Sequence, residues 1–274
     1  MRWRDGGCVQ SDDAMKALVL SAGYGERLRP LTEQTPKPIL EVGGRPLIHY
    51  PLLMLKRAGI TDVAINVHHL ADTIERTLGR GDALGLRITY SPETVLLGTG
   101  GPLLALRTYF GDEPFVLLNC DTILALDLTA MIGFHRERGA LATLALYDAA
   151  DPGAYSRIES DGAQRIRRMR LLRGRARGEF NDYPRELAPA TAARLTPYMY
   201  CGVLVCEPAV LDLAPKSLPM SLMGDLFAPL VAQGLPLFGY VHRGFFRTVD
   251  DLKGYEALRA EFDAAPPPLD YLPR

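Results

Sequence analysis

Short apolar runs alternate with amphipathic stretches along the first half of the chain. Runs such as 16–21 (KALVLS) and 114–118 (PFVLL) are continuous and apolar, which is typical of strands buried on both faces. Between these runs, apolar residues recur at helical spacing. The expected strands are 16–21, 62–67, 86–90, 114–118 and 140–146, and the expected helices are 46–58, 70–78, 102–109 and 128–138. This alternation predicts a mostly parallel sheet with helices on both faces.

The pattern changes after about residue 148. Segments 157–159 and 164–172 flank a Ser-Asp-Gly turn at 160–162, which predicts a β-hairpin. The elements expected after it are a strand at 198–206, helices at 208–213 and 222–233, strands at 235–241 and 245–248, and a closing helix at 250–262. The fold class is therefore α/β with a smaller β-rich part. The sequence has no hexapeptide repeat, so no C-terminal β-helix is expected.

The two ends of the chain differ in composition from the rest. Residues 1–14 are polar and lack the apolar core of a signal peptide, so a disordered extension is expected. Residues 264–274 are rich in proline and are expected to form an extended, peripheral tail. The remainder, 15–263, is predicted to be one domain whose halves, 15–147 and 148–263, meet where the pattern changes.

Composition excludes several classes of protein. The net charge is −1, so no global basic field would attract nucleic acid or an anionic membrane. No apolar run reaches the ~18 residues of a membrane-spanning helix. The four cysteines form no Cys-x-x-Cys pair, which argues against zinc-finger and disulfide frameworks and favours the cytoplasm.

Arginine is concentrated in one segment. Seven arginines lie between residues 165 and 177. A solvated hairpin explains them most simply. The alternative is a flap that faces an anionic, phosphate-bearing substrate.

A glycine-rich loop follows the first strand, at 21–38 (SAGYGERLRPLTEQTPKP). Gly23 and Gly25 allow a tight turn whose N–H groups can face an anion, although a plain turn also explains two such glycines. Arg27 offers a fork for phosphate oxygens, and Lys37 offers a compact positive charge between two prolines. The loop is neither the dinucleotide-binding fingerprint nor a Walker A loop.

The longer string is more specific. Gly-x-Gly-x-Arg-Leu-x-Pro-Leu-Thr followed by Pro-Lys-Pro resembles the signature of the sugar-1-phosphate nucleotidyltransferases, also called nucleotide-sugar pyrophosphorylases. The resemblance continues through 40–46 (LEVGGRP), 97–101 (LGTGG) and 119–122 (NCDT), and covers most of 15–262. It implies a Rossmann-like sheet with a β-rich sugar-binding insertion. It also implies transfer of a nucleotidyl group from an NTP to a sugar 1-phosphate, with Mg²⁺ and release of pyrophosphate.

The resemblance implies a role for each matching residue. The glycine-rich loop would wrap the triphosphate with Ala22, Gly23, Gly25 and Arg27, and Lys37 would contact the reacting phosphates. The remaining assignments are base or ribose contacts by Glu93, Gly98, Thr99 and Gly101, and sugar contacts by Asn119 and Gly202. Arg27, Lys37 and Asp121 would form the catalytic set.

Two aspartates are the implied Mg²⁺ ligands. Asp121 ends the strand at 114–118, where an isolated aspartate is otherwise a turn or helix-capping residue. Near the C-terminus the family's common Trp-x-Asp-Ile-Gly-Thr-Pro is absent. Segment 244–251 (GFFRTVDD) better resembles Gly-Phe-Trp-x-x-Met-Asp-Thr of cytidylyltransferase-like members, which makes Asp250 the second ligand. The alternative is that Asp250 or Asp251 caps the last helix, and both can hold for the pair.

Further departures leave the substrates open. The family's Glu-Lys-Pro segment, which helps to hold the sugar, is absent. The resemblance to mannose and heptose guanylyltransferases favours GTP and a hexose or heptose 1-phosphate. The alternatives are UTP, CTP or dTTP with another sugar, or a catalytically silent regulatory subunit that binds a nucleotide sugar. A homodimer is possible in each case.

Overall fold

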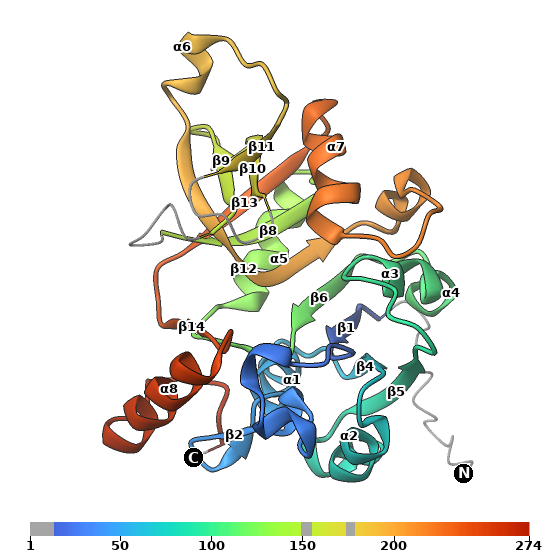
Figure 1. The fold of residues 1–274 in the computed structure, drawn as a ribbon. Coiled ribbons are helices and arrows are strands. Elements are labelled where there is room, and N and C mark those ends of the chain that lie inside the picture. Colours follow the sequence, from blue (N-terminus) through green and yellow to red (C-terminus); the bar gives the residue numbers. More distant parts are fainter. Residues whose placement is uncertain (1–13, 149–154, 174–178, 274) are drawn as a thin grey trace, which may run out of the picture.

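A computed structural model describes residues 14–148, 155–173 and 179–273 (Figure 1). Four adjacent strands of its main sheet are parallel: β6 (Phe115–Asn119), β1 (Lys16–Leu20), β4 (Asp62–Val67) and β5 (Arg87–Pro92). Their carboxyl ends therefore meet at one edge of the sheet, where parallel α/β sheets bind ligands.

The second half of the chain extends the same sheet with mostly antiparallel pairs. Strand β12 (Thr196–Cys206) lies antiparallel to β6 and so joins the two halves. The remaining strands of this half are β13 (Leu237–His242), β9 (Arg157–Ser160), β10 (Ile166–Leu172) and β11 (Phe180–Tyr183). Strand β8 (Ala142–Tyr147) ends the first half, but it pairs with β12 and β13 of the second half and not with the four parallel strands. Strands β9 and β10 form the predicted hairpin. The predicted α/β class with a β-rich second part is confirmed.

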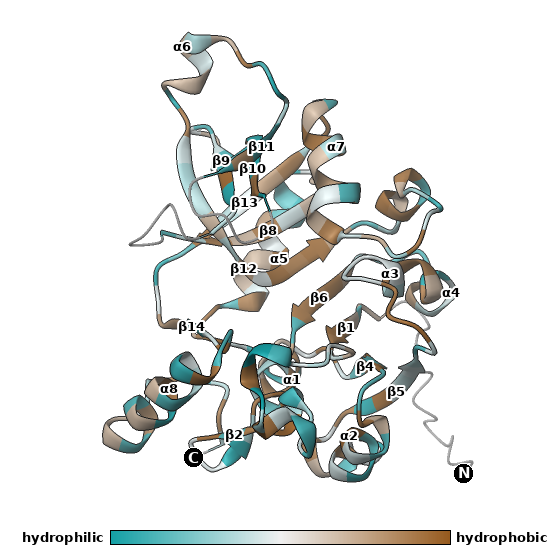
Figure 2. Ribbon diagram, viewed as in Figure 1, coloured by the Kyte–Doolittle hydropathy of each residue, from teal (hydrophilic) through white to brown (hydrophobic). Residues whose placement is uncertain are grey.

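The two faces of the sheet bury separate cores. Successive side chains of a strand point to opposite faces, so Ala17 and Val19 belong to one core and Leu18 to the other. Figure 2 shows β1, β6 and the carboxyl-terminal end of β12 as hydrophobic. The first core is covered by α1 (His49–Arg57), α2 (Ala71–Leu78), α5 (Leu128–Glu137) and α8 (Leu252–Ala264), and the second by α3 (Gly101–Ala105), α4 (Arg107–Phe110) and α7 (Ala228–Ala232).

Three expected helices differ from the prediction. The helix expected from residue 46 begins at His49, because Arg45–Pro46 (β3) pairs with Glu41–Val42 (β2) in a short ribbon. The helix expected at 102–109 divides at Leu106 into α3 and α4. The helix expected at 222–233 begins with a π-helical segment, Leu222–Phe227, where the Ala228 N–H bonds the Met223 carbonyl five residues earlier.

Short elements were missed. They are β7 (Thr122–Leu124), β11 and α6 (Pro189–Ala192), each too short for a periodic signal. Strand β7 matters for the site, because it pairs with β14 (Phe246–Thr248) across more than a hundred residues of sequence.

The proline-rich tail was expected to be peripheral, but two of its side chains are buried. Leu269 and Tyr271 are each 7% exposed and pack in the first core. Their apolar side chains cover core surface that would otherwise face water. Residues 1–13 of the expected extension lie outside the described residues. No helix in the described ranges is long and apolar enough to cross a membrane.

The described arginines of the 165–177 segment have protein partners. Arg168 Nε lies 2.5 Å from Glu159 Oε2, and Arg170 Nε lies 2.9 Å from Asp182 Oδ1. These bonds cross from β10 to β9 and β11. They favour the hairpin interpretation over an anion-facing flap. Arg175 and Arg177 lie outside the described residues.

Candidate functional site

A cavity of about 680 Å³ opens at the carboxyl ends of the parallel strands. All but two of the predicted site residues line it: Ala22, Gly23, Gly25, Arg27, Lys37, Glu93, Gly98, Thr99, Asn119, Asp121 and Asp250. The two that are not among the lining residues are Gly101 and Gly202. Residues from both halves of the chain therefore converge on one cavity.

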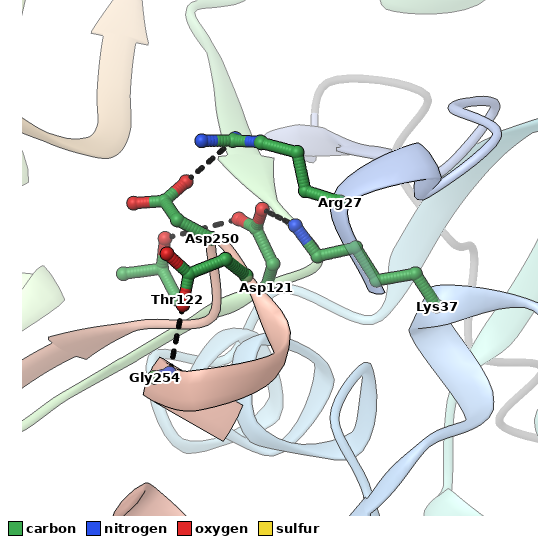
Figure 3. A network of polar contacts seen from close by, with 7 residues as sticks. Arg27, Lys37, Asp121, Thr122, Asp250 and Gly254 are labelled. Atoms are coloured by element: carbon green, nitrogen blue, oxygen red, sulfur yellow. Dashed lines mark hydrogen bonds and ion pairs between the residues drawn. The ribbon is translucent and has the colours of Figure 1, made fainter. Parts of the chain in front are cut away.

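The inner ion pair joins Lys37 and Asp121. Lys37 Nζ donates to Asp121 Oδ2, and the two side chains are 14% and 19% exposed (Figure 3). Ile48 N–H bonds the Pro38 carbonyl at 2.9 Å, and Leu40 N–H bonds the Lys37 carbonyl at 3.2 Å, so the backbone that carries Lys37 is held firmly. The mostly buried pair keeps a cation and a carboxylate in a defined position.

The outer ion pair joins Arg27 and Asp250. Arg27 Nη2 lies 3.0 Å from Asp250 Oδ1, and the side chains are 56% and 38% exposed. Solvent screens such an exposed pair, so it can exchange partners at little cost. The cavity wall thus alternates two cations with two carboxylates, which suits polyanionic ligands and a hard divalent cation.

The β14–β7 ribbon brings the two aspartates together. Thr248 lies opposite Thr122, and Val249 N–H bonds the Asp121 carbonyl at 3.0 Å. Asp250 then follows at the end of the ribbon and reaches the cavity.

The neighbouring Asp251 has a different place. Its Oδ1 accepts from Gly254 N–H at 2.8 Å and caps α8 (Figure 3). Asp250 lines the cavity and Asp251 caps the helix, so the capping alternative holds for Asp251, and the metal-ligand role of Asp250 stays a prediction.

The carboxylates fit Mg²⁺ better than a metal that needs a full protein cage. Among the described residues, no group of three or more His, Cys, Asp or Glu side chains could hold a metal ion. Mg²⁺ commonly takes one or two protein carboxylates and completes its octahedron with phosphate oxygens and water. Asp121 and Asp250 supply such a donor set.

The 97–101 loop is anchored by protein contacts. Gly100 N–H bonds the Met220 carbonyl at 2.8 Å, and the Thr99 hydroxyl accepts from Leu222 N–H at 2.9 Å. Gly98 has φ +78°, and a Cβ there would lie 2.4 Å from the Met220 carbonyl oxygen. The need for glycine at 98 therefore comes from this close approach of two backbones as well as from any ligand.

Replacing Gly98 tests this packing. We expect Gly98→Ala to lower the free energy of unfolding by about 2–4 kcal/mol, from the positive φ and the collision together. Gly59→Ala is the matched control, because Gly59 has φ +80° but nothing within 4 Å of an added Cβ. It should cost only about 1–2 kcal/mol in urea unfolding. An equal loss of unfolding free energy in the two variants would contradict the close contact between the Gly98 and Met220 backbones.

Gly101 and Gly202 were expected to contact ligands, but neither lines the cavity. Gly101 packs against Leu97 and Leu218, where a Cβ would lie 2.6 Å from Leu97 Cβ. Gly202 backs the cavity: a Cβ there would lie 2.9 Å from Asn119 Nδ2. Gly202 thus makes room for Asn119, which does line the cavity.

Cys120 lies beside Asp121 at the cavity floor. Burial, followed by the Asp121 charge, raises the pKa of its thiol to about 12. A thiol whose pKa is raised is less nucleophilic near neutral pH.

Sequence reasoning missed Asn66. It lines the cavity at the end of β4, and its side chain bonds both Ser21 N–H and the Glu93 carboxylate. Its signal was a polar residue in the otherwise apolar end of a buried strand.

Two curated relatives resemble this chain at the level of sequence. N-acetylmuramate alpha-1-phosphate uridylyltransferase of Neisseria meningitidis is 47% identical over 117 residues, which are 42% of this chain and 51% of that protein. Mannose-1-phosphate guanyltransferase of Saccharomyces cerevisiae is 31% identical over 244 residues, 88% of this chain and 63% of that protein. The chain thus spans less than two thirds of the length of either relative.

A solved structure shares the fold. HddC from Yersinia pseudotuberculosis is 17% identical and superposes with a TM-score of 0.71 over 91% of this chain and 100% of that one. Residues 16–170, which carry the glycine-rich loop, Lys37, the 97–101 loop and Asp121, match the family described as Nucleotidyl transferase. The chain belongs to the nucleotidyl transferase family.

Proposed function

We propose that this protein transfers a nucleotidyl group from an NTP to a sugar 1-phosphate and releases pyrophosphate. The observation that carries the proposal is the pair of cation–carboxylate contacts, Lys37–Asp121 and Arg27–Asp250, on the wall of one cavity. Both substrates are polyanions, so a site for this reaction has to neutralise charge and hold two phosphates in line.

The reaction needs no general base. A sugar phosphate oxygen attacks the α-phosphorus, one P–O bond forms, and the P–O bond to the β-phosphate breaks as pyrophosphate leaves. The second phosphate pKa is ~6, so the attacking oxygen is already ionised near neutral pH. The protonated Cys120 thiol in the same cavity is in keeping with chemistry that uses no protein nucleophile.

Each charged residue then has a role. Lys37 stabilises negative charge at the α-phosphate, and Arg27 holds the departing pyrophosphate with its fork of donors. Ala22, Gly23 and Gly25 turn the backbone of the loop toward the triphosphate. Asn119 faces the sugar phosphate, with Gly202 behind it.

Asp121 and Asp250 would hold Mg²⁺. When bound, this ion neutralises phosphate charge and orients the phosphates for displacement. The exposed Arg27–Asp250 pair supports this role, because Asp250 can exchange Arg27 for another cation at little cost.

The relatives suggest candidates for the nucleotide base and the sugar. One relative is a uridylyltransferase and the other a guanyltransferase. We propose GTP first and UTP second, with a hexose or heptose 1-phosphate. The cavity position of Asp250 favours transfer over a silent regulatory subunit.

We also propose separate roles for the two halves of the chain, and a cellular compartment. Residues 15–147 carry most of the nucleotide site, and 148–263 carry the sugar side and the second carboxylate. The free, buried thiols of Cys120, Cys201 and Cys206 support work in the cytoplasm. The homodimer stays a prediction.

The test is a substrate panel. Five nucleotides (ATP, GTP, CTP, UTP and dTTP) are each combined with a set of sugar 1-phosphates and Mg²⁺. Pyrophosphate release and the mass of the nucleotide sugar are both measured. We expect one nucleotide–sugar pair to be turned over. Nucleotide-sugar binding without turnover of any pair would instead support the regulatory function, and no binding at all would contradict the nucleotide site.

A further inference from the structure

Glu93 and Asn66 form a buried hydrogen-bonded pair, which we call the clamp. Glu93 is 7% exposed, at the end of β5. Its Oε1 accepts from Asn66 Nδ2 at 2.7 Å, and its Oε2 accepts from Leu97 N–H at 2.8 Å. Both carboxylate oxygens are therefore engaged by the protein itself. Each oxygen could accept a further bond, but at 7% exposure little of this side chain is open to a ligand.

The clamp connects the two loops that would hold a nucleotide. Asn66 Oδ1 accepts from Ser21 N–H at 2.7 Å, at the start of the glycine-rich loop. Leu97 begins the 97–101 loop, and its carbonyl accepts from Met220 N–H at 2.9 Å. The chain of bonds from Ser21 through Asn66 and Glu93 to Leu97 fixes the spacing of these loops across the ends of β1, β4 and β5.

The chemistry of the partners requires a carboxylate at position 93. Asn66 has committed its only acceptor to Ser21 N–H, so it presents an N–H to Glu93. Leu97 also presents an N–H. The two donors reach different terminal atoms of one side chain, and glutamate offers an oxygen to each, whereas glutamine would offer an N–H to one of them.

A second contact strengthens the same connection. The Glu93 carbonyl accepts from His68 Nδ1 at 2.7 Å, which leaves His68 Nε2 to accept from the Tyr24 hydroxyl at 2.9 Å. Tyr24 lies within the glycine-rich loop and lines the cavity. The loop is thus tied to Glu93 through its backbone as well as through its side chain.

We infer that Glu93 is a positioning residue: with Asn66 it holds the 97–101 loop at a fixed distance from the glycine-rich loop and acts on the nucleotide through those loops. The inference rests on the proposed function for its effect on nucleotide binding. The clamp itself can be measured without a nucleotide.

The experiment exchanges the carboxylate of Glu93 and the amide of Asn66 between the two positions. In Glu93→Gln an amide N–H faces a donor, and in Asn66→Asp two carboxylates face each other, so each single variant loses a buried bond. In the double variant Asn66→Asp/Glu93→Gln, the new carboxylate at position 66 accepts from Ser21 N–H and from the new amide at position 93. The oxygen of that amide accepts from Leu97 N–H. All three bonds and the net charge are retained, and only the bond between positions 66 and 93 changes its direction.

Two measurements distinguish the structural role of the clamp from its effect on the nucleotide: hydrogen exchange of the loop amides and the KM for the nucleotide. We expect each single variant to raise the KM for the nucleotide about tenfold with little change in kcat, and to speed hydrogen exchange of the 97–101 amides about tenfold. The double variant should bring both values within about threefold of wild type. Exchange in β6 serves as the control for global unfolding.

Other results would overturn the inference. Unchanged loop exchange in the single variants would contradict the clamp. A double variant with restored exchange but a KM as high as that of Glu93→Gln would indicate direct contact of the Glu93 carboxylate with the nucleotide. If wild-type protein turns over no nucleotide, the proposed function fails, and the exchange rates alone still decide whether Glu93 clamps the loop.

Discussion

Asp121→Asn should abolish nucleotidyl transfer, with kcat/KM falling by about 10³-fold. The substitution keeps the volume of the side chain but removes the negative charge that faces Lys37. The site would lose its more buried metal-ligand oxygen, and the Lys37 cation would lose its partner. The measurement is pyrophosphate release at saturating Mg²⁺ with the nucleotide–sugar pair that the panel identifies.

A second aspartate provides the control for this variant. Asp127 caps α5 by accepting from Ala130 N–H at 2.9 Å, and asparagine caps helices about as well. Asp127→Asn should therefore keep wild-type activity. Asp127→Asn should also unfold at a temperature similar to that of wild type, whereas Asp121→Asn should unfold at a lower temperature, because it leaves the mostly buried Lys37 cation without its partner. A variant Asp121→Asn that retains a tenth or more of the wild-type kcat/KM would rule out a catalytic role for this carboxylate.

Asp250→Asn should lower kcat/KM by about 10²-fold and raise the Mg²⁺ concentration needed for half-maximal rate. The expected loss is smaller than for Asp121, because Asp250 is the more exposed carboxylate, at 38% against 19%. An exposed ligand can be replaced in part by water. The rate is measured as a function of Mg²⁺ concentration.

The adjacent Asp251 offers an unusually close control. Asp251→Asn removes the same charge one residue away, so long-range electrostatic effects of the two substitutions are nearly equal. Asparagine can still accept from Gly254 N–H and cap α8. Asp251→Asn should thus leave the Mg²⁺ dependence unchanged. If Asp251→Asn raises the Mg²⁺ concentration needed for half-maximal rate as much as Asp250→Asn does, the division of roles between the two aspartates is wrong.

Most of the candidate site followed from local sequence patterns. Buried parallel strands appear as short apolar runs, and the polar residue that ends each run must lie at the same edge of the sheet. Asp121, after β6, was assigned from the resemblance and lies at this edge, and the strand-end logic applied to β4 would have reached Asn66. The glycine-rich loop and Lys37 also lie where the string after β1 predicted them.

Other features depended on contacts that no local pattern encodes. The pairing of β14 with β7 brings Asp250 to the cavity and leaves Asp251 to cap α8, although the sequence alone cannot tell the two aspartates apart. Similarly, Leu269 and Tyr271 are buried because core surface is available beside them, while their proline-rich surroundings predicted a peripheral tail.

The sequence by itself determined the alternation of strand and helix, the chemistry of the glycine-rich loop and the family to which it is similar. The tertiary structure decided which groups meet: Gly98 against the Met220 backbone, Glu93 between Asn66 and Leu97, and Asp250 beside Arg27. The physical reason is that hydrophobic periodicity reports which face of one element is buried. The partner that covers that face, or that completes a buried hydrogen bond, is chosen by packing between segments far apart in the chain.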